Sequence, residues 1–261
     1  MLAETYSSRF EHLWRLPFFF GGVLALIGYM LRRHLPPEQI ESESRNAPTS
    51  EEKRKHPSAR WPALQAFREI PRTMIVAMLF TCGYGISNYL TMVFLPTFGR
   101  EFANVAESSA LRANMAGQAL ALVIVPLAGW ISDRWIRRRT FLACAFLLEA
   151  ALAWELFVAV MKAGVAGLWL AQLLFAGILA VVMGTAPAML AEQFPRGYRV
   201  SGHALVLNVG IGIAGGSAPM VAVALIRGTG SNLAPAAYLM TACVVSGVAA
   251  LLLSDRSREP L

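Results

Sequence analysis

The sequence predicts an all-α protein that crosses a membrane about seven times. The 261 residues are 56% hydrophobic and 15% charged, and their mean hydropathy is +0.51. A soluble domain has roughly 25% charged and 45–50% apolar residues, so this is the composition of a membrane protein. Apolar stretches near the roughly 20 residues that a helical span needs alternate with short charged segments. This alternation predicts a polytopic helical bundle.

The charge of the chain indicates the lipid bilayer as a partner. The net charge is +7, which nucleic-acid-binding proteins also show. The sequence does not interleave exposed aromatic and basic residues as a nucleic-acid platform does. Lys and Arg accumulate in the cytoplasmic loops of membrane proteins, and this explanation also fits the apolar composition. We therefore expect no nucleic-acid partner.

The first apolar stretch, Leu16–Leu31, is short for a span, but Trp14 and Arg33 flank it as interfacial anchors. The next segment, 32–72, is polar and has too few apolar residues to bury a core, so we expect a flexible cytoplasmic linker. The chain is thus expected to consist of three parts, 1–31, 32–72 and 73–261.

Six further spans are expected in the third part, at about 73–98, 113–132, 140–160, 165–194, 201–226 and 234–253. Their short connections make successive helices antiparallel, and seven crossings place the two termini on opposite sides. The loops on one side carry 17 of the 23 Lys and Arg residues. These loops are 32–72, 133–139, 195–200 and the tail after 253. The positive-inside rule makes that side cytoplasmic, so we expect the N-terminus outside and the C-terminus in the cytoplasm.

A charged loop between the second and third of these spans carries a recognisable pattern. Gly129 would let two helices approach closely, and Asp133 could sit at a helix N-terminus, where the dipole favours an anion. The pattern resembles the loop signature of the major facilitator superfamily, glycine-x-leucine-x-aspartate-arginine-x-glycine-arginine-arginine, although Ile136 stands where that family has glycine. The matching positions are Gly129, Asp133, Arg134, Arg137 and Arg138.

A second pattern lies in the loop after the fourth of these spans. It is similar to the signature glutamate-x-phenylalanine-proline-x-x-x-arginine-x-x-glycine, which lies between the tenth and eleventh helices of the same superfamily. We expect Glu192 and Arg199 to form charge pairs across this inner loop and Pro195 to end the preceding helix. The matching positions are Glu192, Phe194, Pro195, Arg199 and Gly202.

Further segments are similar to the metabolite:proton symporter branch, which contains proline/betaine, α-ketoglutarate, citrate and shikimate carriers. These segments are Trp14–Phe18, Tyr89–Pro96 and Pro235–Met240. The resemblance covers nearly the whole chain, but only helices 6–12 of a 12-helix carrier. It implies a sixth-helix equivalent at 1–31 and a C-terminal six-helix bundle at 73–261. The bundle would be built from two inverted repeats of three helices. Seven spans also fit a heptahelical receptor, but these motifs do not.

The function implied by the resemblance is proton-coupled symport of a small polar metabolite across the cell (inner) membrane by alternating access. The metabolite would be an organic acid or a zwitterionic osmolyte. A separately encoded N-terminal half could be a partner, because one bundle offers only one wall of a shared cavity. A truncated inactive remnant and a membrane interaction or regulatory protein stay open as alternatives.

No nucleophile constellation, metal cluster or phosphate loop argues for an enzyme, so we expect no catalytic residue, metal or cofactor. The cysteines lie inside apolar stretches and are expected to be packing residues. The run Gly210–Gly215 reads G-x-G-x-x-G, but it lies inside an apolar stretch and lacks the acid that a dinucleotide site needs about 20 residues later. Gly212 and Gly216 are expected to form a small-xxx-small pair for close helix packing, and Pro219 to bend the same helix.

Polar residues inside spans are candidates for a substrate path. Spacings of 3, 4 and 3 place Thr81, Tyr84, Asn88 and Thr91 on one helical face. The resemblance makes this the seventh helix, which lines the central cavity, so cavity lining and interhelical hydrogen bonding both stay open for these residues. Gly83 and Gly85 could loosen this helix. The weaker candidates are Asn114, Gln118 and Asn208.

Two acids, Glu149 and Glu155, lie inside the 140–160 span. A spacing of six places them roughly 120° apart around a helix, so they do not form one paired site. An acid at mid-depth costs a few kcal/mol unless it is protonated or paired. A proton carrier is one interpretation. We favour the other, in which the acids snorkel or lie on a peripheral helix.

Overall fold

A computed structural model describes residues 15–33, 62–195 and 199–254, and these residues contain helices and no strand. The chain divides into two compact units, Met1–Ser58 and Ala59–Leu261. Most of the expected linker 32–72 lies outside the described residues.

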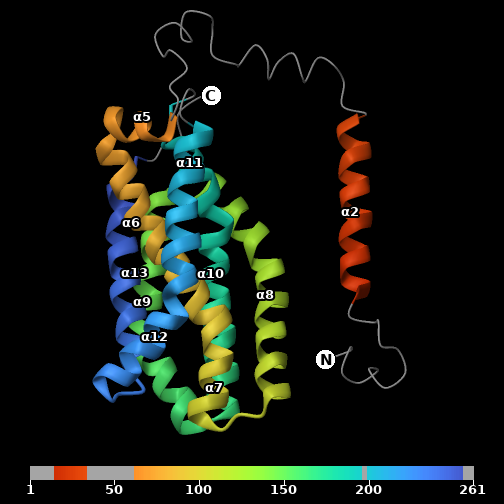
Figure 1. Ribbon diagram of the computed structural model, residues 1–261, viewed down its shortest axis with the longest axis vertical. Coiled ribbons are helices and arrows are strands. Elements are labelled where there is room, and N and C mark those ends of the chain that lie inside the picture. Colours follow the sequence, from red (N-terminus) through yellow and green to blue (C-terminus); the bar gives the residue numbers. More distant parts are fainter. Residues whose placement is uncertain (1–14, 34–61, 196–198, 255–261) are drawn as a thin grey trace, which may run out of the picture. The chain divides into compact units, whose positions relative to one another are not determined.

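In the first unit, helix α2 spans Leu16–Arg33, where the first apolar stretch was expected (Figure 1). Its apolar part, Phe18–Leu31, is shorter than each of the candidate spans of the second unit. Phe18 and Leu24 are examples of its exposed apolar side chains. By length, α2 is therefore the weakest candidate for a membrane crossing.

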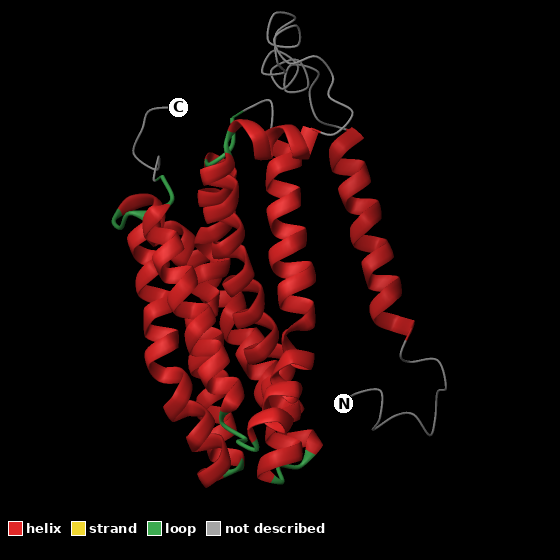
Figure 2. Ribbon diagram, turned by 60° about the vertical axis from the view of Figure 1, so that its left-hand side comes forward, coloured by secondary structure: helices red, strands yellow, loops and turns green. Residues whose placement is uncertain are grey.

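The second unit begins with the short helix α5, Pro62–Glu69, and continues as an upright helical bundle (Figures 1 and 2). Among the described residues, six helices are long and apolar enough to cross a membrane: Pro71–Ala103, Glu107–Arg134, Arg138–Ala163, Val165–Glu192, Arg199–Thr229 and Ala234–Leu252. Each coincides with one of the six expected spans. The second to fourth and the last of them are α8, α9, α10 and α13. The all-α polytopic fold is therefore confirmed.

Short turns hold successive helices antiparallel. Helix α9 meets α10 through the single residue Gly164, whose φ of 55° lies in the left-handed region that favours glycine. Gly230, with a φ of 68°, follows the fifth span in the same way. Pro71 and Pro235 each start a helix, where a missing backbone N–H costs nothing.

Two spans contain a π-helical turn, each followed by a proline. The first span runs through α6 (Pro71–Asn88), η2 (Tyr89–Phe94) and α7 (Leu95–Ala103), with Pro96 just after η2. The fifth span runs through α11 (Arg199–Leu207), η3 (Asn208–Gly215) and α12 (Gly216–Thr229), with Pro219 just after η3. A proline removes one backbone donor and so frees a carbonyl in the preceding turn.

The bundle packs as two groups of helices that are joined mainly where α9 lies against α13. Helix α10 lies between α8 and α9, whereas α6 lies between η3 and α13. The contact of α6 with η3 is backbone on backbone. A Cβ added to Gly215 would lie 2.9 Å from the backbone of Gly85, and a Cβ added to Gly85 would overlap the carbonyl oxygen of Gly210. The other face of α6 presents Gly83 to Ser246 of α13.

These contacts correct the expectation for Gly83 and Gly85, and they leave close packing at Gly212 and Gly216 a prediction. Gly83 and Gly85 do not loosen α6 but allow its two closest approaches, and the irregular turn lies further on in η2. Gly212 and Gly216 face open space, with no atom within 4 Å of an added Cβ. The residues that η3 uses for close packing inside the bundle are Gly210 and Gly215.

Candidate functional site

The two sequence signatures meet at one end of the bundle, where α8 connects to α9 and α10 to α11. We call this the signature end. The Nη2 atom of Arg138 lies 2.7 Å from Oδ1 of Asp133, and its Nη1 atom donates a hydrogen bond to Oε1 of Glu192. One guanidinium group therefore bridges the end of α8 and the end of α10.

The bridge differs from the expected arrangement in two respects. Asp133 lies in the last turn of α8, not at a helix N-terminus, and it faces the cation that begins α9. Glu192 was expected to pair with Arg199. Its ion pair is with Arg138 instead, whereas Nε of Arg199 donates to the carbonyl of Phe194 at 3.4 Å. The sequence could not show that α8, α9 and α10 are neighbours at this point.

Burial is graded across the bridge. The side chain of Arg138 is 13% exposed, that of Glu192 29% and that of Asp133 60%. Arg134 lies over the ring of Trp130 at 5.3 Å, a cation–π arrangement at the same end, and Arg137 is exposed. Among the charged residues of the loop signature, Arg138 is therefore half-buried, whereas Asp133, Arg134 and Arg137 lie on the surface.

Close packing of α8 on α10 supports the signature end. A Cβ added to Gly129 would lie 3.4 Å from the carbonyl oxygen of Gly184, an ordinary contact. A Cβ added to Gly184 would overlap the carbonyl oxygen of Val125. The expected close approach at Gly129 is present, but Gly184 of α10 is the residue that tolerates no side chain.

The inner loop after α10 is fixed by residues that we had not singled out. Pro195 is exposed, and residues 196–198 lie outside the described residues. Just before it, Gln193 clamps the end of α13: its Nε2 donates to the carbonyl of Ser254 at 2.6 Å, and its Oε1 accepts from the Ser254 hydroxyl at 2.9 Å. This clamp joins the ends of α10 and α13.

The four polar residues of the first span do not act alike. Thr81 is buried and donates to the carbonyl of Val206 in α11 at 2.8 Å, and Thr91 is buried and donates to the carbonyl of Ser87 at 2.8 Å. These two hydroxyls are thus used inside the bundle. Tyr84 and Asn88 are only half-buried. Of the four, they are the better placed to meet a ligand.

Gln118 of α8 and Asn208 of η3 are exposed. Nδ2 of Asn208 donates to the carbonyl of Ala204, one turn earlier in the same span. The described pockets are lined neither by these two residues nor by Tyr84 and Asn88. Their role in lining a cavity therefore stays a prediction.

Two amide side chains hold the irregular turn of the first span. Nδ2 of Asn114 in α8 donates to the carbonyl of Met92 at 3.1 Å, and Nε2 of Gln172 in α10 donates to the carbonyl of Thr91 at 3.3 Å. Pro96 explains why these carbonyls need partners, because its missing N–H is the donor that would otherwise reach one of them. Gln172 is fully buried, and its Oε1 has no hydrogen-bond partner among the described residues.

Glu149 differs from what we expected. It does not snorkel or lie at the periphery but is fully buried, where α9 meets α6 and α13. The hydroxyl of Ser87 donates to its Oε1 at 2.5 Å. Its Oε2 makes no hydrogen bond of ordinary geometry among the described residues, and the thiol of Cys243 in α13 is the hydrogen-bonding neighbour of the same carboxyl group. Sequence reasoning found the acid but not its partners.

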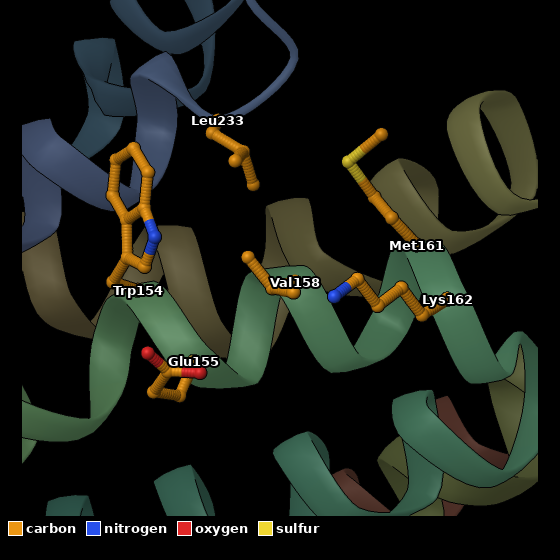
Figure 3. A pocket seen from close by; sticks show the side chains of 6 residues that line it. All are labelled: Trp154, Glu155, Val158, Met161, Lys162 and Leu233. Atoms are coloured by element: carbon orange, nitrogen blue, oxygen red, sulfur yellow. The ribbon is translucent and has the colours of Figure 1, made fainter.

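Glu155 is exposed, as expected, beside a surface pocket of about 580 Å³ near the opposite end of α9 (Figure 3). Leu233, from the segment before α13, lies across the pocket from Trp154 and Met161. Lys162 brings a positive charge to the same pocket. A second groove, of about 700 Å³, lies between η2–α7 and α12 and includes Thr97 and Arg227. Of these polar groups, Glu155 had been considered from the sequence, whereas Lys162, Thr97 and Arg227 had not.

Comparison with known proteins adds the family. The profile of the Major Facilitator Superfamily matches residues 1–154. Over 254 residues the chain is 25% identical to the ectoine/proline transporter ProP of Corynebacterium glutamicum, covering 95% of this chain and 49% of the transporter. It is 28% identical to the citrate-proton symporter of Salmonella typhi, covering 93% of this chain and 54% of the symporter. It is 25% identical to the shikimate transporter of Escherichia coli (strain K12), covering 94% of this chain and 55% of the transporter.

The chain therefore spans about half the length of the curated relatives that it matches. These relatives are named as an ectoine/proline transporter, a citrate-proton symporter and a shikimate transporter, and carriers of proline, citrate and shikimate are among those that the motifs had indicated. The profile covers more than half of the chain. The chain belongs to the Major Facilitator Superfamily.

Proposed function

We propose that this chain forms the C-terminal portion of a proton-coupled symporter for a small polar metabolite, such as an organic acid or a zwitterionic osmolyte. The relatives named above carry citrate, shikimate, or ectoine and proline. Each of these is small and polar. In this proposal, residues 1–31 are the equivalent of a carrier's sixth helix, 32–72 the cytoplasmic linker and 73–261 the C-terminal bundle.

The observation that carries the proposal is the uneven burial of the six spans. Only 22% of the most apolar part of α8 and 28% of that of the α11–η3–α12 span are buried, against 50–56% for the other four. Asn208, Gly212 and Gly216 recur every four residues on the fifth span and are exposed. Small residues on an open face allow another helix to approach closely. These two spans are the surface against which a second bundle would pack.

Alternating access gives this surface a role. In such carriers two bundles rock about a binding site near the middle of the membrane, so the half-buried Tyr84 and Asn88 would form part of one wall. The exposed carboxylate of Asp133 would brace against the fifth helix of the other half, as the family resemblance implies. The excess of Lys and Arg at the signature end supports a cytoplasmic location for that end, with the N-terminus outside.

Reconstitution tests the proposal. The chain is placed in proteoliposomes alone and together with a co-expressed N-terminal half from a relative, and uptake of labelled proline or citrate is driven by an acid-outside gradient. We expect uptake that a protonophore abolishes with both halves and none with this chain alone, because one bundle supplies one cavity wall. Robust uptake by the 261-residue chain alone would contradict the need for a second half.

The same assay separates the alternatives. If neither preparation transports or binds proline, citrate, shikimate or ectoine, the symporter proposal fails. An inactive remnant or an interaction protein then becomes the better description. Variants of Asn88 add a specificity control, because a cavity residue changes metabolite binding without unfolding the bundle.

A further inference from the structure

We propose that Glu149 is a proton-binding site inside the bundle, and that the presence of its proton is transmitted through Ser87 and η2 to the amide pair Asn114–Gln172. Glu149 would thus be a positioning residue rather than one that touches substrate. Only the link to symport rests on the function proposed above. The proton site and its effect on η2 stand on the geometry of this chain.

Glu149 lies deep inside the bundle. Glu149 lies 11 residues after the start of α9, about 16 Å along the helix axis, and no part of it is exposed. A carboxylate so placed is costly unless it is paired or binds a proton. Its first oxygen accepts from Ser87, and its second makes no hydrogen bond of ordinary geometry among the described residues. A fully buried carboxyl group whose partners are only a hydroxyl and a thiol is arranged to take up a proton.

The groups that surround Glu149 carry no positive charge among the described residues. The titratable group that faces it from α13 is the neutral thiol of Cys243, and α6 contributes the hydroxyl of Ser87. Helix α13 has no charged residue, and the single charged residue of α10, Glu192, lies at its far end and pairs with Arg138. The charged residues of α9 itself lie nearer its ends or on its exposed face. No cation among the described residues competes with a proton for this carboxyl group.

A series of hydrogen bonds connects Glu149 to the amide pair Asn114–Gln172. Ser87, which donates to Glu149, has a carbonyl that accepts from the hydroxyl of Thr91 at 2.8 Å. The carbonyl of Thr91 in turn accepts from Gln172 at 3.3 Å. Oδ1 of Asn114 lies 3.5 Å from the same Gln172 nitrogen. The carboxyl group and the amide pair are therefore the two ends of one hydrogen-bonded path across four of the six spans.

The chemistry of the site is a single equilibrium: the carboxylate takes one proton from water and becomes the carboxylic acid, and no other bond forms or breaks. In the acid form one oxygen accepts from Ser87, and the new O–H can donate to the sulfur of Cys243, the other hydrogen-bonding neighbour. The carboxylate is charged and needs more donors than Ser87 and Cys243 supply, so loss of the proton favours a rearrangement of the segment around Ser87 that brings further donors to it. Because Ser87 lies two residues before η2 and its carbonyl accepts from Thr91, that rearrangement strains η2. The proton thereby stabilises the regular contact of η2 with Asn114 and Gln172.

Infrared difference spectroscopy on the full chain in lipid nanodiscs tests the proton site, because a protonated carboxyl group has its own carbonyl stretching band. We expect a band that disappears as the pH is raised, that is absent in Glu149→Gln and that remains in Glu155→Gln. Glu155 is the matched control, an exposed acid on the same helix. Absence of the band, or a band that does not titrate while the protein stays folded, would overturn the proposal.

Hydrogen exchange tests the transmission. After correction for the intrinsic pH dependence of exchange, the amides of Tyr89–Phe94 are expected to exchange faster above the pH at which the band is lost. This pH response is expected to be missing in Glu149→Gln and reduced in Ser87→Ala, and to be kept in Glu155→Gln. If the band titrates but the exchange of η2 does not follow it, the path is refuted.

Transport is a separate arm of the test. A chain that shows both responses but supports no symport would refute the proposed function and leave the proton site intact. If Glu149→Gln does not fold, Ser87→Ala still tests the path, because it removes one hydroxyl and keeps the acid. In that variant the band is expected to shift in frequency, since the carboxyl group loses its hydrogen-bond donor.

Discussion

Arg138 and Glu192, 54 residues apart, join the first turn of α9 to the last turn of α10 through a direct guanidinium–carboxylate bond. Replacing Arg138 by Ala leaves the partly buried Glu192 without this partner. We expect the free energy of unfolding to fall by about 1.5–3 kcal/mol, the range for a hydrogen bond to a charged group. Denaturant titration of the purified protein in detergent measures it. Asp133→Asn is expected to cost less than about 1 kcal/mol, because Asp133 is largely exposed.

Arg137→Ala is the control, since it removes an exposed neighbour from the same loop. Equal losses for Arg137→Ala and Arg138→Ala would show that net charge, and not the bridge to Glu192, stabilises the signature end.

The amide pair around η2 makes a second prediction. Asn114→Ala removes the donor to the carbonyl of Met92, and we expect a loss of about 1–3 kcal/mol for the unpaired carbonyl. In a Pro96→Ala background the loss is expected to shrink, because that substitution restores a backbone N–H in the next turn. A double-mutant cycle of unfolding free energies measures the difference. Gln118→Ala, an exposed amide one turn further along α8, is expected to change stability by less than about 0.5 kcal/mol.

Two glycines of the fifth span are expected to differ in how much their substitution by alanine changes stability. Gly210→Ala places a methyl group against Thr81 and is expected to cost about 1–3 kcal/mol by overpacking. Gly216→Ala meets no atom within 4 Å and is expected to be neutral or slightly stabilising, since alanine favours a helix more than glycine does. Thermal unfolding of the two variants compares them. Equal destabilisation would contradict the assignment of Gly216 to an open face.

A fourth prediction concerns the reconstituted symporter. Asn88→Ala is expected to raise the KM for metabolite uptake about fivefold, which corresponds to roughly 1 kcal/mol for one lost hydrogen bond. Thr81→Val is expected to leave KM unchanged and to lower stability instead, because its hydroxyl is bonded to the carbonyl of Val206. Initial uptake rates at varied proline or citrate concentration distinguish the two. A rise in KM for Thr81→Val would contradict this prediction and indicate that Thr81 lines the cavity.

Much of the fold could be predicted from hydropathy. All six spans of the second unit were found because burial in lipid requires long apolar helices. Their ends were harder to place. The second span was expected to begin at residue 113, but α8 begins at Glu107, because backbone hydrogen bonding continues beyond the apolar segment. The two π-helical turns were not predicted, although Pro96 and Pro219 were visible signs of freed carbonyls.

The candidate site could be predicted only in part, because sequence does not show which helices are neighbours. The charged residues of both signatures were found, but their pairing was wrong, since Arg138 lies closer to Glu192 than Arg199 does. The face drawn through Thr81 and Thr91 assumed 3.6 residues per turn, and η2 breaks that period before Thr91. Glu149 was noticed as an acid in an apolar stretch. Its burial could not be predicted, because the sequence does not show that Ser87 of another helix lies beside it.

The contact of Gly85 with Gly210 and Gly215 also limits how this protein can change over generations. Where side chains meet, a larger residue on one helix can be matched by a smaller one opposite. At this contact both surfaces are already peptide backbone, so nothing smaller can compensate. A substitution that enlarges Gly85 or Gly215, whose nearest neighbours are backbone atoms alone, can be suppressed only by moving a whole helix. Genetic screens for second-site revertants should therefore recover few or none within α6 and η3.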